Sequence, residues 1–320
     1  AWVPVVVEGA HCFSAVKGMR AGTRDEIGDF YAIAWRDADD RWHRILDPLA
    51  TSLPFGAMAP AELYDIEQMR AGRGDKSYFE AFRTDGIHKV GPPANILQIH
   101  VPTATAGGTI ASLTRYYERL SERVARGLPL ESADQLFLGY DAVQLLPVEP
   151  TTVYETGPDF WQEGDGDADA VTVELLRPDT TNWGYDVVIS GMAAINPVLL
   201  ESGRPDELVD FATVLHNFPK RPKQLIFDVV FGHSDNQGLR ALNGHFFAGP
   251  NMYGQDLDLA HPVVRALLLE LQRRKVALGV DGVRVDGAQD FKVWDEARGE
   301  IVVHTLRASF TRAEARALRD

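Results

Sequence analysis

Two side chains that could support covalent chemistry stand two residues apart in the sequence, at Arg284 and Asp286. The alternation of residue types around them predicts a short strand, with Val283 and Val285 on one face and the arginine and aspartate on the other. The guanidinium can hold the carboxylate ionised and fix its orientation. An ionised carboxylate at a strand end suits the nucleophile of a retaining glycosidase. On this stretch alone, a buried structural Arg–Asp pair is the favoured interpretation.

A second carboxylate, Asp228, interrupts an otherwise apolar predicted strand at 224–231. An apolar run of this kind is typical of a strand that is covered on both faces of a parallel sheet. An ionised carboxylate in such a strand needs a partner, because its unpaired burial carries a severe desolvation cost. Arg284 on the next predicted strand is the expected partner.

Loops after other predicted strands carry groups suited to sugars. His233 falls just past the strand that holds Asp228, and an imidazole can donate a hydrogen bond to a hydroxyl. Tyr185 and Asp186 lie in the long loop after the strand at 140–146 and offer an aromatic face beside a carboxylate. Taken singly, a solvated histidine and a plain turn explain these residues better. Their common position after successive strands favours a shared site.

From residue 95 onward, strands and helices alternate along the chain. Strands are expected at 96–101, 140–146, 224–231 and 282–286, and helices at 110–127, at 206–215 and from Pro262 onward. The order predicts an α/β fold with a (β/α) barrel of the TIM type, whose sites lie at the carboxyl ends of the strands. A doubly wound open sheet is the rival. Four strand–helix units are too few to close eight strands, so the barrel is expected to be incomplete, with open edges prone to self-association.

The first 90 residues differ from the rest. Short β-prone pieces separated by turn residues predict a small antiparallel, sandwich-like β domain at 1–90. Gly91-Pro92-Pro93 marks the boundary, and residues 91–320 are expected to form the amino-terminal half of a catalytic (β/α)8 barrel. The arginine- and alanine-rich tail from residue 297 predicts a solvated basic helix.

Composition narrows the function classes. A formal net charge of -14 over 320 residues argues against nucleic acid or an anionic membrane as a partner, and is compatible with a neutral sugar. Cys12 is the single cysteine, so no internal disulfide forms and a cytoplasmic location is expected. The first residues lack the pattern of a signal peptide, and no apolar run has the length of a membrane span.

The segments 225–233 and 282–286 resemble the first two signature regions of the α-amylase superfamily of retaining glycoside hydrolases. Four further segments, at 96–109, 142–148, 183–186 and 257–265, match the usual pattern of that family in the usual order. Within the superfamily, the segment 284–291 is most similar to glucosylglycerol hydrolases. The amino-terminal β region is similar to domains that precede the barrel in several members, including branching enzymes.

This resemblance implies a role for each candidate residue. Asp286 would be the nucleophile and Arg284 its orienting partner, with no cofactor. The resemblance implies substrate contacts around them: Asp228 and His233 in the glycone subsite, Tyr185 as stacking platform, Asp186 beside it, and Gln289 and Asp290 on the aglycone side.

Two departures from the family pattern matter. Gly232 stands where the family commonly has an asparagine involved in calcium binding, so no metal is predicted. The general acid/base glutamate is not identifiable, because Glu296, Glu300 and Glu314 lie in unlike contexts. We therefore expect a member truncated after the second signature region, or one with a diverged tail. Retaining hydrolysis of an α-glucoside is the leading function. A branching or transglycosylating enzyme and a catalytically impaired carbohydrate-binding fragment are the alternatives.

Overall fold

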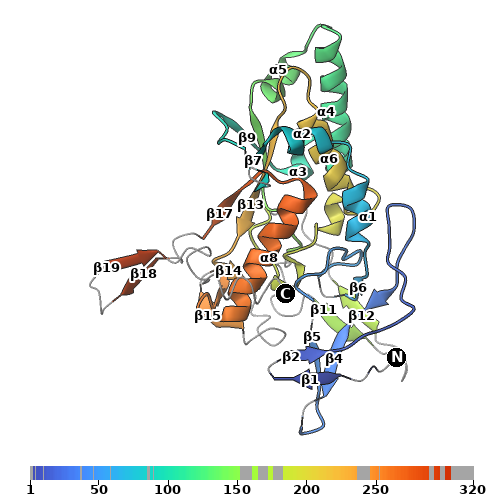
Figure 1. The fold of residues 1–320 in the computed structure, drawn as a ribbon, viewed down its shortest axis with the longest axis vertical. Coiled ribbons are helices and arrows are strands. Elements are labelled where there is room, and N and C mark those ends of the chain that lie inside the picture. Colours follow the sequence, from blue (N-terminus) through green and yellow to red (C-terminus); the bar gives the residue numbers. More distant parts are fainter. Residues whose placement is uncertain are drawn as a thin grey trace.

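A computed structural model of the protein describes residues 3–151, 161–164, 172–175, 183–235, 246–287, 292–295 and 300–303, apart from positions 4, 10, 37, 46, 58, 85, 86, 89 and 252. At its centre lies a parallel sheet of four strands in the order β17-β13-β10-β9 (Figure 1). The strands are β9 (Ile96–Ile99), β10 (Ala142–Leu145), β13 (Gln224–Val230) and β17 (Gly282–Asp286). Each strand pairs with the parallel strand that precedes or follows it in the chain. This order has no reversal, so the sheet resembles part of a barrel, as predicted, and not a doubly wound sheet.

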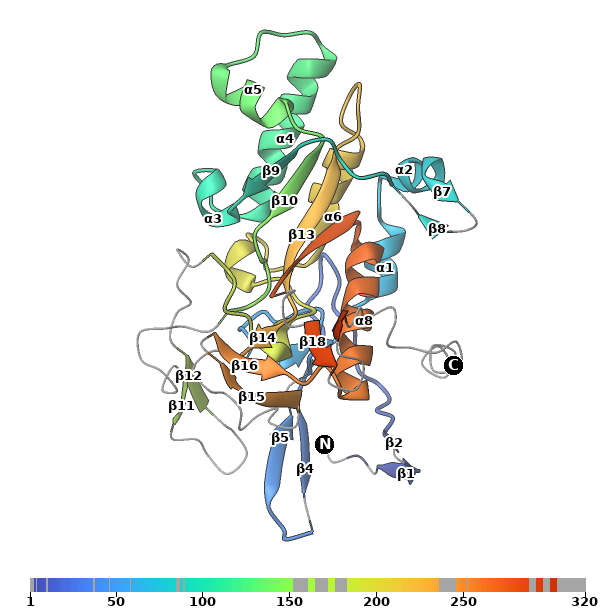
Figure 2. The ribbon, with the colours of Figure 1, turned by 90° about the vertical axis from the view of Figure 1, so that its left-hand side faces the viewer.

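One long helix follows each of the first three strands and lies against the sheet (Figure 2). They are α4 (Ile110–Ala125), α6 (Asp206–His216) and α8 (Pro262–Leu278). Helix α4 begins with a capping box, in which Thr109 and Ser112 each accept the other's backbone N–H. Helix α8 has Pro262 in its first turn and ends at Gly279, whose φ of 110° is available to glycine at little cost.

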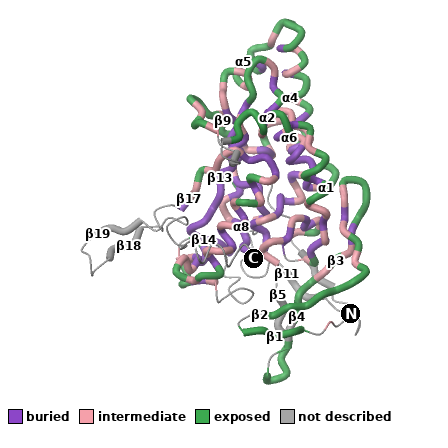
Figure 3. The backbone as a smooth tube through the Cα atoms, in the orientation of Figure 1, coloured by how far each residue is buried: buried purple, intermediate pink, exposed green. Residues whose placement is uncertain are grey.

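The apolar core lies between this sheet and its helices, and the inner strands β10 and β13 are among the most buried parts of the chain in Figure 3. The helical stripe expected from the sequence is fully or almost fully buried: Ile110, Leu113, Tyr117, Leu120 and Val124. The apolar positions of β13 are buried on both faces of the strand. Burial at about 25 cal/mol per Å² of apolar surface makes this layer the main source of stability.

The region before the sheet contains antiparallel pairs of short strands. The strands are β1 (Val6–Glu8), β2 (His11–Phe13), β3 (Phe30–Tyr31), β4 (Ile33–Arg36), β5 (Trp42–Ile45), β6 (Ala61–Glu62), β7 (Arg83–Thr84) and β8 (Ile87–His88). Within the described residues they pair as β1-β2, β3-β6, β4-β5 and β7-β8, and β4 and β5 are antiparallel neighbours in the chain. Tyr64 and Met69 belong to the core of the central sheet, so this region is not packed independently. The domain boundary near residue 90 stays a prediction.

The sequence analysis missed several short elements. They are the helices α1 (Ile66–Ala71), α2 (Lys76–Ala81), α3 (Val101–Ala104) and α5 (Ser132–Leu138), the 3-10 turns η2 (Ile189–Gly191) and η3 (Pro197–Leu199), and the strands β11 (Trp161–Gly164), β12 (Thr172–Leu175), β14 (His233–Ser234), β15 (Phe247–Asn251), β16 (Gly254–Leu257) and β18 (Lys292–Asp295). The helix expected from residue 297 is wrong at β19 (Glu300–Val303), which pairs with β18. Consecutive Ile301, Val302 and Val303 favour a strand over a helix there. No helix among the described residues has the length and apolarity needed to cross a membrane.

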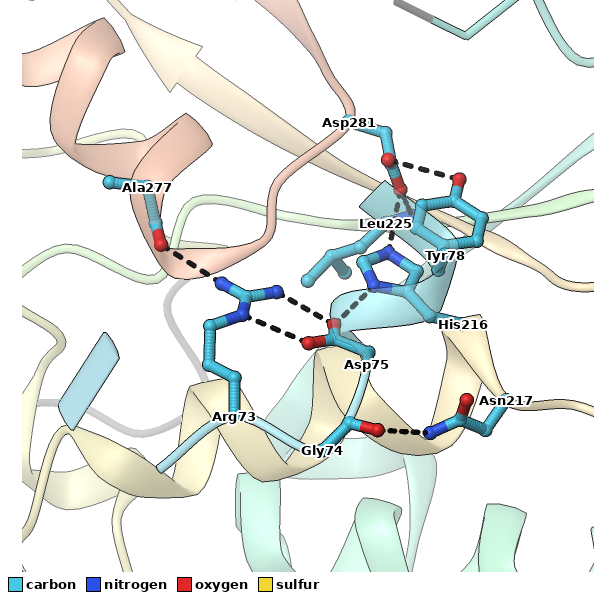
Figure 4. A network of polar contacts seen from close by, with 9 residues as sticks. All are labelled: Arg73, Gly74, Asp75, Tyr78, His216, Asn217, Leu225, Ala277 and Asp281. Carbon is cyan, nitrogen blue, oxygen red and sulfur yellow. Dashed lines mark hydrogen bonds and ion pairs between the residues drawn. The ribbon is translucent and has the colours of Figure 1, made fainter. Parts of the chain in front are cut away.

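A buried polar network joins the α1–α2 segment to the amino edge of the sheet (Figure 4). His216, the last residue of α6, places Nδ1 2.5 Å from Asp75 Oδ2 and Nε2 2.9 Å from Asp281 Oδ2. Asp75 also accepts two hydrogen bonds from Arg73, at 2.9 and 2.7 Å. The Tyr78 ring stacks on the imidazole with 3.9 Å between centroids. The network therefore fixes two segments, 73–78 and the end of α6, against Asp281 just before β17.

Opposing effects set the protonation of this network. Burial, the largest effect, acts to lower the pKa of His216, but hydrogen bonds and attraction from Asp281 and Asp75 outweigh it and raise that pKa. Burial also acts to raise the pKa of Asp75, yet the bonds from His216 and Arg73 lower it to about 2. An imidazolium between two carboxylates is the state that these contacts stabilise.

Replacement of His216 by alanine is expected to lower the free energy of unfolding by about 3–5 kcal/mol, because it leaves two buried carboxylates without their common partner. The raised pKa adds a pH dependence: the stabilisation is complete below about pH 6.5 and is lost as pH rises through the folded-state pKa. Urea unfolding at several pH values measures both effects. The exposed pair Arg115–Glu201 is the control, and Arg115→Ala should change stability little. A loss for H216A that does not shrink at higher pH would contradict the charged state.

Candidate active site

Arg284 joins two carboxylates at the carboxyl half of β13 and β17. Its Nη1 atom donates to Asp228 Oδ1 at 2.8 Å and to Asp286 Oδ1 at 2.7 Å. Asp228 and Arg284 are direct neighbours in the register of the two parallel strands. Asp286 follows two residues later on the same face, because side chains alternate along a strand. The pairing that the sequence predicted for Asp228 and Arg284 is therefore present.

Asp228 is the centre of a larger ring of donors. Its Oδ2 atom accepts hydrogen bonds from Tyr185 Oη at 2.8 Å, Gln144 Nε2 at 3.1 Å and Gln98 Nε2 at 3.2 Å. With Arg284, four donors from three strands and one loop converge on a side chain that has no exposed surface. Such saturation offsets the cost of burying a carboxylate.

The two carboxylates on Arg284 differ in access. The Asp228 side chain is 0% exposed, whereas that of Asp286 is 28% exposed. Asp228 is enclosed by its donors and acts as a fixed anchor for Arg284, and its contact with a sugar stays a prediction. Asp286 is held by the same guanidinium but faces outward at the strand end. Of the two carboxylates on Arg284, Asp286 is thus the accessible one, and its role as nucleophile stays a prediction.

Tyr185 approaches this cluster from the long loop after β10. Burial is the main cause that raises the pKa of its phenol, and the hydrogen bond to Asp228 adds to it. The phenol is therefore a donor at neutral pH, with its ring half-buried. Gly184 before it has a φ of 93°, and a Cβ there would lie 2.3 Å from the Pro147 carbonyl oxygen. A glycine is required at this position for the loop to bring Tyr185 onto Asp228.

His233 is buried and is not the solvated loop residue of the simplest expectation. It begins β14, and its Nε2 lies 3.0 Å from the Tyr185 carbonyl oxygen. Since a carbonyl oxygen only accepts, Nε2 carries the ring hydrogen and donates it to this bond. The exposed ring of Tyr253 covers the imidazole at 5.2 Å between centroids. Within this structure His233 holds the Tyr185 loop, and its contact with a sugar stays a prediction.

Of the remaining predicted site residues, the structure describes Asp186 but not Gln289 and Asp290. Asp186 follows Tyr185 on the same loop and is half-buried. Gln289 and Asp290 lie outside the described residues, so the predicted aglycone side stays a prediction. Among the residues that the structure covers, no group of three or more His, Cys, Asp or Glu side chains is spaced to hold a metal ion.

Gln98 and Gln144 are the site residues that the sequence analysis missed. Each is the single polar residue inside a short apolar strand, at Ile96–Ile99 and Ala142–Leu145. That is the signal that singled out Asp228 in the next strand. The two glutamines pair in the register of β9 and β10, so their amides lie on the same face of the sheet.

Comparison with known proteins gives a family and a fold. A family model described as hypothetical glycoside hydrolase 5 matches residues 2–305. No curated protein matches the chain. The match agrees with the predicted resemblance to glycoside hydrolases, and the finer likeness to glucosylglycerol hydrolases stays a prediction.

Solved structures of amylase-type enzymes share the fold. One is from Salmonella typhimurium, with a provisional assignment as an alpha amylase: TM-score 0.57, 18% identity, 91% of this chain and 39% of that chain covered. A second is the pullulanase from Paenibacillus barengoltzii in complex with maltohexaose and alpha-cyclodextrin. It has a TM-score of 0.55 and 17% identity, with 82% of this chain and 40% of that chain covered. A third is the pullulanase from Anoxybacillus sp. LM18-11 complexed with maltotriose. It has a TM-score of 0.54 and 17% identity, with 89% of this chain and 40% of that chain covered. The chain thus spans about two fifths of the length of these proteins.

Replacement of Gln144 by leucine tests the ring of donors around Asp228. The change removes one hydrogen bond to a buried carboxylate, so the free energy of unfolding should fall by about 1–3 kcal/mol in urea titrations. Gln135→Leu, on an exposed face of α5, is the matched control and should change stability by no more than about 0.5 kcal/mol. Equal small effects for both variants would show that Asp228 does not depend on this donor.

Proposed function

Because the chain belongs to the family described as hypothetical glycoside hydrolase 5, we propose that it provides the nucleophile and glycone subsite of a retaining glycoside hydrolase that acts on α-glucosides. The observation that carries this proposal is the shared guanidinium, which holds one enclosed and one accessible carboxylate. Glucosylglycerol is the proposed substrate, supported by the sequence of the segment that begins at Arg284.

In the proposed first step, an oxygen of Asp286 attacks the anomeric carbon of the glucoside. The new C–O ester bond forms as the bond to the leaving oxygen breaks, and that oxygen takes up a proton from a general acid. Water then attacks the same carbon and gives a proton to the group that acted as the acid, while the C–O ester bond to Asp286 breaks and glucose and the free carboxylate are released. Arg284 orients the Asp286 carboxylate for the first step and is placed beside it when it is released in the second.

Tyr185 and Asp228 would form the floor of the glycone subsite. The donors on Asp228 keep it from rotating, so Arg284 and the Tyr185 ring stay in fixed positions around Asp286. Stacking of the tyrosine ring on the C–H face of a pyranose would add affinity without a net charge. Pre-positioned groups of this kind lower the barrier because little reorganisation accompanies the reaction.

The general acid of this reaction is not identified among the described residues. A retaining enzyme needs a second carboxyl roughly 5 Å from the nucleophile. Asp228 is unsuited to the role, since it is enclosed and accepts four hydrogen bonds. The nucleophile is therefore tested first and by itself, with a substrate whose leaving group needs no proton.

5-Fluoro-α-glucosyl fluoride supplies such a leaving group, since fluoride departs without a general acid. We expect one fluoroglucosyl group on the peptide that contains Asp286, measured by peptide mass spectrometry after brief incubation. Asp286→Asn should remove the label, because an amide is a much poorer nucleophile. Asp210→Asn, on the surface of α6, changes the charge equally and should label like the unmodified protein.

Absence of label from the unmodified protein would contradict the proposal and favour a protein that only binds carbohydrate. Label at another residue would also contradict it. If the label forms, product analysis with glucosylglycerol, in the presence and absence of an added sugar acceptor, separates a hydrolase from a branching or transglycosylating enzyme.

A further inference from the structure

The segment 233–235, just after β13, contacts the Tyr185 loop at alternate residues. His233 Nε2 donates to the Tyr185 carbonyl oxygen at 3.0 Å. Two residues further along the loop, the Val187 carbonyl oxygen accepts the Asp235 backbone N–H at 2.9 Å. At the next alternate position, the Ile189 backbone N–H donates to Asp235 Oδ1 at 2.8 Å. The two segments thus meet at three alternate loop residues, once between backbones and twice through the His233 and Asp235 side chains.

Ser234 strengthens the middle of this contact. Its Oγ atom lies 3.1 Å from the Val187 carbonyl oxygen and 3.0 Å from Asp235 Oδ1, and its single hydrogen donates to one of them. On its other side, the loop is held by Val188, whose backbone N–H donates to the Pro150 carbonyl oxygen at 3.2 Å. The segment 185–189 is therefore fixed from both sides.

Asp235 is enclosed and conformationally strained. Its exposure is 1%, so a ligand in the site does not touch it. Its φ of 49° is in the left-handed region, which costs a non-glycine residue about 1–3 kcal/mol and persists only where surrounding contacts enforce it. Aspartate is among the residues that best tolerate this region, since its short side chain bonds to nearby backbone.

We infer that Asp235 is a positioning residue for Tyr185, acting through the Ile189 and Val187 backbone to hold the loop that brings the tyrosine onto Asp228. This inference rests on the proposed function in one respect, that Tyr185 receives the sugar. Loss of the Asp235 side chain frees the Ile189 amide and lets the loop move away from the anchor. The bonds of the loop that remain are those from His233, Ser234 and the Asp235 backbone N–H, the Val188–Pro150 bond and the bond of the Tyr185 hydroxyl, and none of them reaches the Ile189 amide.

The role needs an acceptor oxygen and does not need a charge. Among the described residues, Asp235 Oδ2 has no hydrogen-bond partner, and burial raises the pKa of the carboxyl to about 6 despite the bonds from Ile189 and Ser234. Asparagine keeps an oxygen of the same geometry and fills the same volume. Asp235→Asn should therefore preserve the position of the loop, whereas Asp235→Ala should not.

Hydrogen exchange tests this inference without any ligand. In Asp235→Ala, exchange in the peptide that covers 185–191 should rise about tenfold or more, as expected for loss of a protecting hydrogen bond and local opening. Peptides from β10 and α4 should exchange as in the unmodified protein, and Asp235→Asn should stay within about threefold of it throughout. Unchanged exchange at 185–191 in Asp235→Ala overturns the inference. A rise spread equally over the whole chain also overturns it, because that indicates only a structural role.

Binding of maltotriose, measured by titration calorimetry, gives the second readout. Asp235→Ala should raise the Kd about tenfold, Asp235→Asn should restore it, and Asp235→Ala should have little further effect in a Tyr185→Ala background. An equal effect of Asp235→Ala in both backgrounds overturns the positioning role. If the unmodified protein binds no maltotriose, the proposed subsite fails and the hydrogen-exchange result still decides whether Asp235 positions the loop.

Discussion

The buried charge of Asp228 is the constraint on which the candidate site depends. A carboxylate with no exposed surface in the middle of an apolar strand is tolerated only when donors surround it. β9 and β10 each supply a glutamine, the loop after β10 supplies a tyrosine, and β17 supplies Arg284. The four segments therefore have to reach the same point, and the guanidinium that satisfies Asp228 is the group that orients Asp286.

A cation bonds two carboxylates at each edge of the sheet, and the two arrangements differ in their exposure to solvent. At the amino edge, His216 bonds two carboxylates through its two ring nitrogens and stacks on the ring of Tyr78, so its polar atoms are used in contacts that hold the fold. At the carboxyl edge, Arg284 also bonds two carboxylates but remains 48% exposed, with Asp286 beside it. Barrel proteins commonly place stability at the first edge and chemistry at the second.

Much of this arrangement could be predicted from the sequence, because it depends on local alternation. The strands and the long helices follow from apolar periodicity, and the Asp228–Arg284 pair follows from one charge in an apolar strand. The burial of His233 could not be predicted, since it depends on β14 pairing with β16, which the sequence analysis did not predict as a strand. The contacts of Asp235 could not be predicted either, because they are to backbone atoms of the Tyr185 loop, and any residue type offers the same backbone atoms. The expected basic helix failed where consecutive β-branched residues form β19.

We propose that the Arg284 guanidinium presents Asp286, and not Asp228, to the anomeric carbon of a sugar. The decisive measurement is a crystal structure of the protein after reaction with 5-fluoro-α-glucosyl fluoride. We expect a bond from the sugar carbon to an oxygen of Asp286, with Arg284 still between Asp286 and an unmodified Asp228, and with the Tyr185 ring against the sugar. A sugar bound away from this edge, or bonded to another residue, would contradict it.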